Sequence, residues 1–65
     1  MFDYKNSTLD QMIAHIKLAS TALVSRMRQY HAKKGNKEVV KMIDMARQYV
    51  KLEKVQQRMD ELQND

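Results

Sequence analysis

The sequence predicts an all-α protein built as an antiparallel two-helix hairpin, and three observations support this prediction. The 65 residues contain no proline and a single glycine, which argues against a fold rich in loops. Apolar residues recur at steps of three and four along most of the chain, as they do on one face of a helix. The glycine, Gly35, is followed by Asn36 near the middle of the chain, so the turn is expected at 35–36. A chain of this length forms one domain, residues 1–65.

The first helix is expected over residues 8–34, after a short irregular lead at residues 1–6. Ser7 or Thr8 is a suitable N-cap, because either hydroxyl can accept a free backbone N–H of the first turn. The apolar positions of this helix are Leu9, Ile13, Ile16, Leu23, Met27 and Tyr30, with Ser20 in the one gap. Two interpretations of Ser20 are open: a buried hydroxyl bonded to the carbonyl four residues back, or a narrow waist where a third helix crosses.

The second helix is expected over residues 37–63, with two apolar sets along its length. The first set is Val39, Met42, Ile43, Ala46, Tyr49 and Val50, and the second is Leu52, Val55, Met59 and Leu62. At about 100° per residue the two sets point roughly 165° apart, so one neighbour cannot cover both. No glycine or proline marks a bend, which favours a second set that meets a different surface.

Association with another chain is expected from these apolar faces. In a hairpin that closes at Gly35, Leu9, Ile13 and Ile16 have no obvious partner within the chain. The predicted protein-interaction residues are therefore Leu9, Ile13, Ile16, Leu52, Val55, Met59 and Leu62. The first prediction is a dimeric helical bundle. For the C-terminal set, self-association, a different protein partner and a local core formed after a bend all remain open.

Positive charge is concentrated around the turn. The candidate anion- or nucleic-acid-binding residues are Arg26, Arg28, Lys33, Lys34, Lys37 and Lys41. Such a cluster can neutralise phosphates, and the alternative is a solvated hairpin tip whose charges complement the helix dipole. His31, in the last turn of the first helix, is interpreted as a dipole-compensating cap, with a pH switch or a nucleic-acid contact as alternatives. His15 is expected at the solvated surface, and Tyr30 in the core.

Several classes of protein are disfavoured. The chain has no cysteine, and its two histidines are too few for a metal cage, so no metal or cofactor is expected. No signal peptide and no run of about 18 apolar residues is visible, which predicts a cytoplasmic protein without a membrane partner. No nucleophile elbow, phosphate loop or zinc-protease motif occurs, so neither enzyme activity nor a small-molecule substrate is expected.

Two functions follow as hypotheses. The first is a small interaction or regulatory protein, of the bacterial or phage type, that forms a homodimer or higher oligomer and binds or inhibits another protein. The alternative is a nucleic-acid-binding regulator that places the basic hairpin tip on the phosphate backbone. An electrophoretic shift with generic DNA and RNA at low salt distinguishes them.

Overall fold

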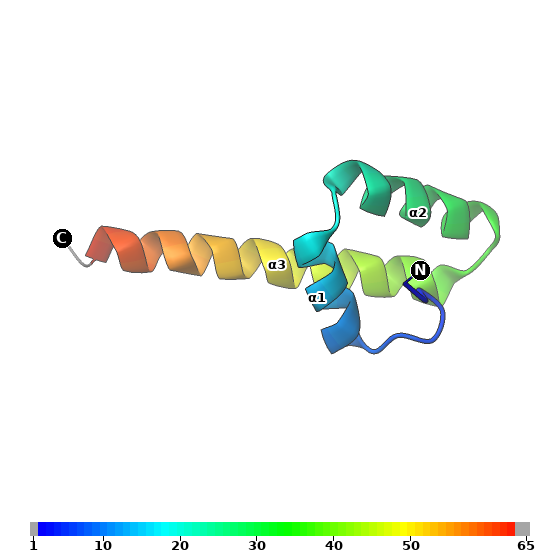
Figure 1. The fold of residues 1–65 in the computed structure, drawn as a ribbon, viewed down its shortest axis with the longest axis horizontal. Helices are drawn as coiled ribbons and strands as arrows, with labels where there is room; N and C mark the ends of the chain where they lie inside the picture. The colour runs from blue at the N-terminus through cyan, green and yellow to red at the C-terminus, as the bar shows by residue number, and fades with distance from the viewer. Residues whose placement is uncertain (1, 64–65) are drawn as a thin grey trace.

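The computed structural model describes the backbone of residues 2–63 and the side chains of residues 2–59, and this range contains three helices. They are α1 (Leu9–Leu18), α2 (Thr21–Lys33) and α3 (Lys37–Gln63). Figure 1 shows α3 as the long axis, with α1 crossing it and α2 running beside its first half. The all-α prediction is confirmed for these residues, as is the second helix. Among the described residues, no helix has the length and hydropathy of a membrane span.

The turn before α3 lies where the sequence placed it. Gly35 has a φ of 79°, a left-handed conformation that glycine adopts without steric cost. The backbone N–H of Asn36 donates to the carbonyl of His31 at 2.9 Å, and so closes the end of α2. The chain reverses here and α3 returns along α2.

The single helix predicted over residues 8–34 is wrong, because the chain breaks between α1 and α2. Ala19 and Ser20 are extended, with ψ of 154° and 149°. The Ser20 hydroxyl is the N-cap of α2 and accepts the backbone N–H of Leu23 at 3.2 Å. Both interpretations of Ser20 as a mid-helix residue are therefore wrong. The physical reason is that a serine hydroxyl satisfies a helix N-terminus better than it tolerates a helix interior.

Because of the break, α1 crosses α3. The apolar face of α1, which had no partner in the predicted hairpin, therefore packs against the core. Leu9, Ile13 and Ile16 are half-buried against the core, so the expectation that they lack a partner within the chain is wrong. The buried apolar side chains are Tyr4, Met12, Val24, Val39, Ile43 and Ala46. Capping holds α1 at its start, where Thr8 and Gln11 form a reciprocal capping box.

The N-terminal lead is irregular, as expected, but its aromatic side chains join the core. Tyr4 is only 6% exposed, and Phe2 packs against the same cluster. The Asp3 carboxylate accepts the backbone N–H groups of Lys5 and Asn6, which folds the lead into a turn. Together with the amide of Asn6, these donors hold the pKa of Asp3 below its usual value.

Beyond Val50, α3 continues without a bend and leaves the rest of the molecule. We call residues 2–50 the globule and residues 51–63 the stem. The molecule is 48 Å long and 20 Å across because the stem projects alone (Figure 1). Side chains 51–59 are all exposed. The sequence-based preference for an unbroken helix over a bend near Val50 is thus confirmed.

Candidate protein-interaction surface

Large apolar side chains lie exposed along one face of α3. They are Met45, Tyr49, Leu52, Val55 and Met59, and each is between 40% and 63% exposed. We call these five residues the α3 apolar face. Single exposed apolar residues are common on proteins, whereas a run of them on one helix face marks an interaction site. The side chain of Leu62, which the sequence placed in this set, lies outside the described residues.

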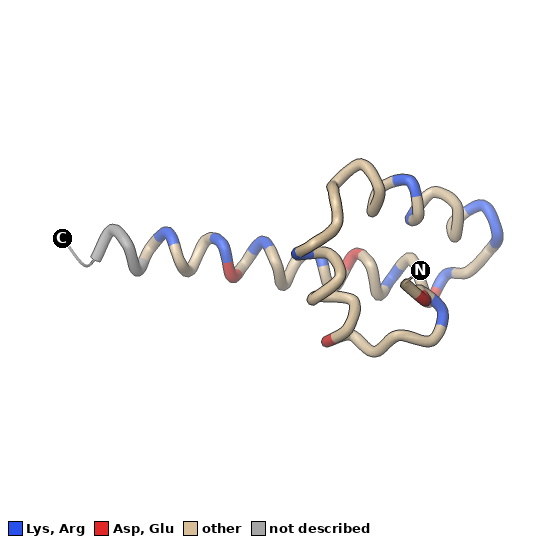
Figure 2. The backbone as a smooth tube through the Cα atoms, in the orientation of Figure 1, with Lys and Arg blue, Asp and Glu red and all other residues tan. Residues whose placement is uncertain are grey.

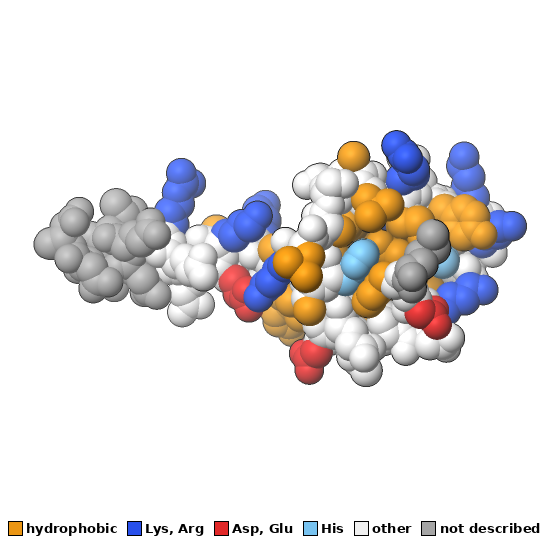
Figure 3. All heavy atoms as spheres, viewed as in Figure 1, with side chains coloured by type: hydrophobic (Ala, Val, Ile, Leu, Met, Phe, Trp, Pro, Cys, Tyr) orange, Lys and Arg blue, Asp and Glu red, His pale blue; other side chains and the backbone are white. Residues whose placement is uncertain are grey.

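This face is opposite to the one that packs in the globule. Val39, Ile43 and Ala46 are at most 8% exposed and face α1 and α2. At about 100° per residue the α3 apolar face points roughly 145° away from them. Figure 3 shows hydrophobic side chains at the surface where the stem leaves the globule. The helices of this chain therefore cover one side of α3 and leave the other open.

The stem is tied to the globule by one ion pair among the described residues. The Lys17 ammonium lies 2.6 Å from the Glu53 carboxylate, and both side chains are about half exposed. The other charged residues of the described stem, Lys51, Lys54 and Arg58, are basic and exposed. Figure 2 shows that Lys and Arg positions recur along the stem. The open helix is thus apolar on one face and positively charged beside it.

The basic residues predicted around the turn do not form one surface. Arg28 donates from Nε and from a terminal nitrogen to the two carboxylate oxygens of Asp44, at 2.7 and 3.0 Å. These hydrogen bonds hold the pKa of Asp44 below its usual value and occupy Arg28. The Lys34 ammonium lies 5.6 Å from the centre of the Tyr30 ring, which is half exposed, so the core position predicted for Tyr30 is wrong.

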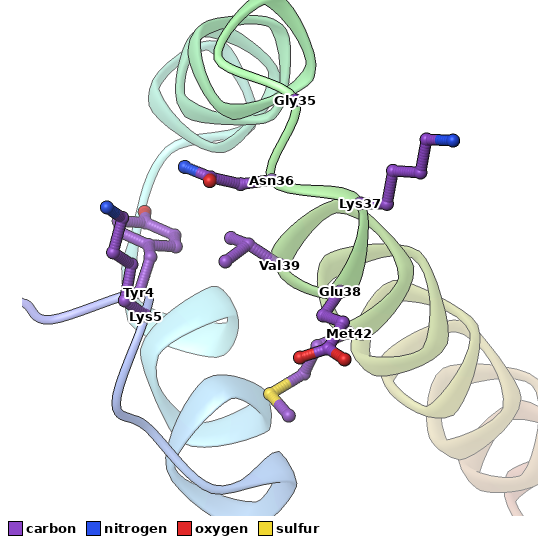
Figure 4. A pocket seen from close by; sticks show the side chains of 8 residues that line it. All are labelled: Tyr4, Lys5, Gly35, Asn36, Lys37, Glu38, Val39 and Met42. Atoms are coloured by element: carbon purple, nitrogen blue, oxygen red, sulfur yellow. The ribbon is translucent and has the colours of Figure 1, made fainter.

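The remaining predicted cations spread over two open hollows and the outer surface. Lys37 and Lys41 line a hollow of about 400 Å³ between Ala32 of α2 and the first half of α3. A second hollow of about 480 Å³ lies between the N-terminal lead and the start of α3. In Figure 4, Val39 and Met42 point into this second hollow while Lys37 points away from it. Arg26 and Lys33 are exposed on α2.

Both histidines pack against aromatic rings, which the sequence did not indicate. His15 stacks on Phe2 with ring centres 4.0 Å apart, and its Nε2 hydrogen-bonds the Tyr4 hydroxyl at 2.6 Å. The solvated position predicted for His15 is therefore wrong. Burial lowers the pKa of His15 and raises that of Tyr4. The available signal was the pair of aromatic residues at positions 2 and 4 of an otherwise polar lead.

His31 lies in the last turn of α2, as expected, but it is only 5% exposed. Its Nδ1 lies 3.1 Å from the side-chain amide nitrogen of Asn36, and its ring contacts Tyr4 and Tyr30. It is a hydrogen-bonded core residue at the position where a dipole-compensating cap was expected. Among the described residues, no three His, Cys, Asp or Glu side chains are grouped to hold a metal ion.

Comparisons with protein-family models, with curated proteins and with solved structures find no match to this chain. The function is therefore inferred from the surface alone, and the α3 apolar face is its most distinctive feature.

Proposed function

We propose that this chain is a small, non-enzymatic protein-interaction module that acts through the α3 apolar face. It associates with itself and binds or inhibits another protein by packing this face against a partner helix. The observation that supports the proposal is the run of exposed large apolar residues along α3, from Met45 to Met59. Burying each such side chain fully is worth about 1.5–3 kcal/mol, a large gain for a chain whose own stability is of the order of 5 kcal/mol.

The stem itself supports a docking role. An isolated helix shorter than about 12–15 residues is marginal in water, because nucleation is costly and tertiary packing normally supplies most of its stability. Residues 51–59 have no buried side chain, so they obtain little of that packing within the chain. Docking on a partner would supply the missing burial. Met45 and Met59 suit such a surface, since unbranched methionine adapts to irregular partners.

Sedimentation equilibrium at micromolar concentration tests this proposal. The wild-type chain is expected to be a dimer or higher oligomer, and Leu52→Asp/Met59→Asp is expected to be monomeric while the globule keeps its helical circular dichroism. The matched control is Lys54→Gln/Gln57→Asp, which changes the net charge equally on the opposite side of the stem. A folded wild-type chain that stays monomeric at this concentration contradicts self-association.

A second function, nucleic-acid binding, has one specific observation in its favour. Lys33, Lys34 and Lys37 are exposed around the turn between α2 and α3, and basic residues gather there in Figure 2. Such lysines can neutralise phosphates, with an affinity that falls steeply as salt rises. Fluorescence anisotropy with generic DNA and RNA at low and high salt tests it. The variant Lys33→Glu/Lys34→Glu/Lys37→Glu should abolish binding. An affinity that changes neither with salt nor in this variant would exclude the turn as the nucleic-acid-binding surface.

A further inference from the structure

We infer that the α3 apolar face pairs with the same face of a second copy of this chain, as a parallel and in-register coiled coil over residues 45–59. This inference rests on the proposed function and specifies the partner and the geometry. Two features of the exposed helix support it. One is the position of a single polar residue within the apolar row, and the other is the uneven charge beside that row.

The exposed residues follow a heptad pattern. Met45, Leu52 and Met59 are seven residues apart and occupy one core position of the heptad, and Val55 occupies the other. Gln48 occupies that second position one heptad earlier and is exposed beside Met45. Tyr49 lies at the edge of the row. The row is therefore apolar at every core position from 45 to 59 except at Gln48.

Gln48 sets the register of the pairing. In a parallel, in-register pair each core residue faces its own copy, so the two Gln48 amides can hydrogen-bond each other. In the antiparallel register that sets Leu52 against Val55, Gln48 faces Met59 of the copy and each amide loses a polar partner. Burying an amide without a hydrogen-bond partner is unfavourable, and in a symmetric antiparallel pair the loss occurs twice.

The charges beside the row favour the same geometry. Lys51 and Arg58 lie along one side of it, with Lys54 and Arg47 further round on that side. The other side carries the uncharged Gln56 and, further round, Glu53. Antiparallel helices place identical sides together, so the basic sides would face each other and repel. Parallel helices place the basic side of one copy against the uncharged and acidic side of the other.

The globules do not obstruct this pairing. In a parallel pair both globules lie at the same end, which requires that α1 and α2 keep clear of the contact. The buried contact of both is on the Val39–Ile43–Ala46 side of α3, roughly 145° from the α3 apolar face, and α2 approaches the row through the Arg28–Asp44 pair at the row's first turn. An acidic helix of another protein could also pair with Lys51 and Arg58. A second copy in register also places a glutamine directly opposite Gln48.

Disulfide trapping tests the inference, because the chain contains no cysteine. Single variants Gln48→Cys and Met59→Cys, the double variant Gln48→Cys/Met59→Cys and the control Lys54→Cys are oxidised with a glutathione redox buffer at micromolar protein. Lys54 points away from the row, so its variant reports random collision. Thiols held together react at an effective concentration near millimolar, so each single seam variant should form at least about tenfold more linked dimer than the control.

Three outcomes decide between the possibilities. Linked dimer from each single seam variant supports the parallel pair. If the double variant forms linked dimer while neither single variant forms more than Lys54→Cys does, the pair is antiparallel. That outcome overturns this inference, and the proposed function stands. No linkage above the control in any variant, with a monomeric wild type by sedimentation, overturns both. Circular dichroism of each variant verifies that the helices are retained.

Discussion

The two halves of α3 belong to one continuous helix and are stabilised differently. In residues 37–50, Val39, Ile43 and Ala46 are buried against α1 and α2. In residues 51–59 every side chain is exposed. Neither half contains glycine or proline, but the first has four β-branched residues, which are weaker helix formers, and the second has only Val55. The difference shows that burial on one face fixes the first half, whereas the second half depends on local hydrogen bonds and on whatever covers its apolar face.

This contrast separates folding from association within one helix. A substitution in the first half should change the free energy of unfolding at any protein concentration. A substitution on the apolar face of the second half should change association and leave the folded globule almost intact. The predictions below test this separation, from the largest expected effect to the smallest.

The largest effect is expected from Ile43→Ala, because Ile43 is fully buried where α3 meets the core. Removing three buried carbons leaves a cavity and typically costs about 2–5 kcal/mol, which approaches the whole stability of a small domain. The matched change in the stem, Leu52→Ala, should alter the stability of the monomer by less than about 0.5 kcal/mol. Urea unfolding at low protein concentration measures both. Equal losses would show that the stem is part of the folding unit.

The sequence predicted α3 well because its signals are local and mutually consistent. Gly35 and Asn36 mark the turn, and no breaker interrupts residues 37–63. The exposure of Leu52, Val55 and Met59 also followed from periodicity, since a change of face along a straight helix can be calculated from the residue spacing.

The break at Ala19–Ser20 could not be found in the same way. The steps of three and four run from Leu9 to Tyr30 with Ser20 as the one polar member, so periodicity alone does not show that the chain changes direction. Only the cap preference of Ser20 opposed that pattern. Missing the break also misplaced Leu9, Ile13 and Ile16, which the turned α1 carries onto the core. The burial of Phe2 and Tyr4 depends on tertiary contacts with His15, which no local pattern encodes.

The second prediction concerns the cap that makes this break. Ser20→Ala removes the hydroxyl that accepts the Leu23 N–H and should reduce the stability of the globule by about 1 kcal/mol. Ser20→Asp is the control, because its carboxylate can accept the same hydrogen and also favours the helix N-terminus. Urea unfolding followed at 222 nm measures the difference. If Ser20→Ala were more stable than wild type, a continuous helix over residues 8–34 would be the better description.

The third prediction concerns pH and again separates the globule from the stem. Burial lowers the pKa of His15, so the folded state binds a proton less readily than the unfolded state. The contribution of neutral His15 to the free energy of unfolding is therefore complete above about pH 6.5, the usual pKa of histidine. This contribution is lost as the pH falls below that value. The free energy of unfolding between pH 8 and pH 5 should decrease more steeply for wild type than for His15→Gln. Identical pH profiles would contradict a buried, neutral His15, and Leu52→Ala in the stem should leave the wild-type profile unchanged.

The smallest effects are expected from the two ion pairs, one within the globule and one between globule and stem. Arg28 and Asp44 form two parallel hydrogen bonds, whereas Lys17 and Glu53 share a single contact at 2.6 Å. All four side chains are about half exposed, so each pair should couple by about 0.2–1 kcal/mol at most. The two-bond pair should be the stronger, since its geometry fixes the guanidinium against the carboxylate. Double-mutant cycles to alanine, in low salt and in 1 M NaCl, measure both couplings. A Lys17–Glu53 coupling energy larger than that of Arg28–Asp44 would mean that α1 holds the stem in place before any partner binds. The two halves of α3 would then differ in exposure but not in stability.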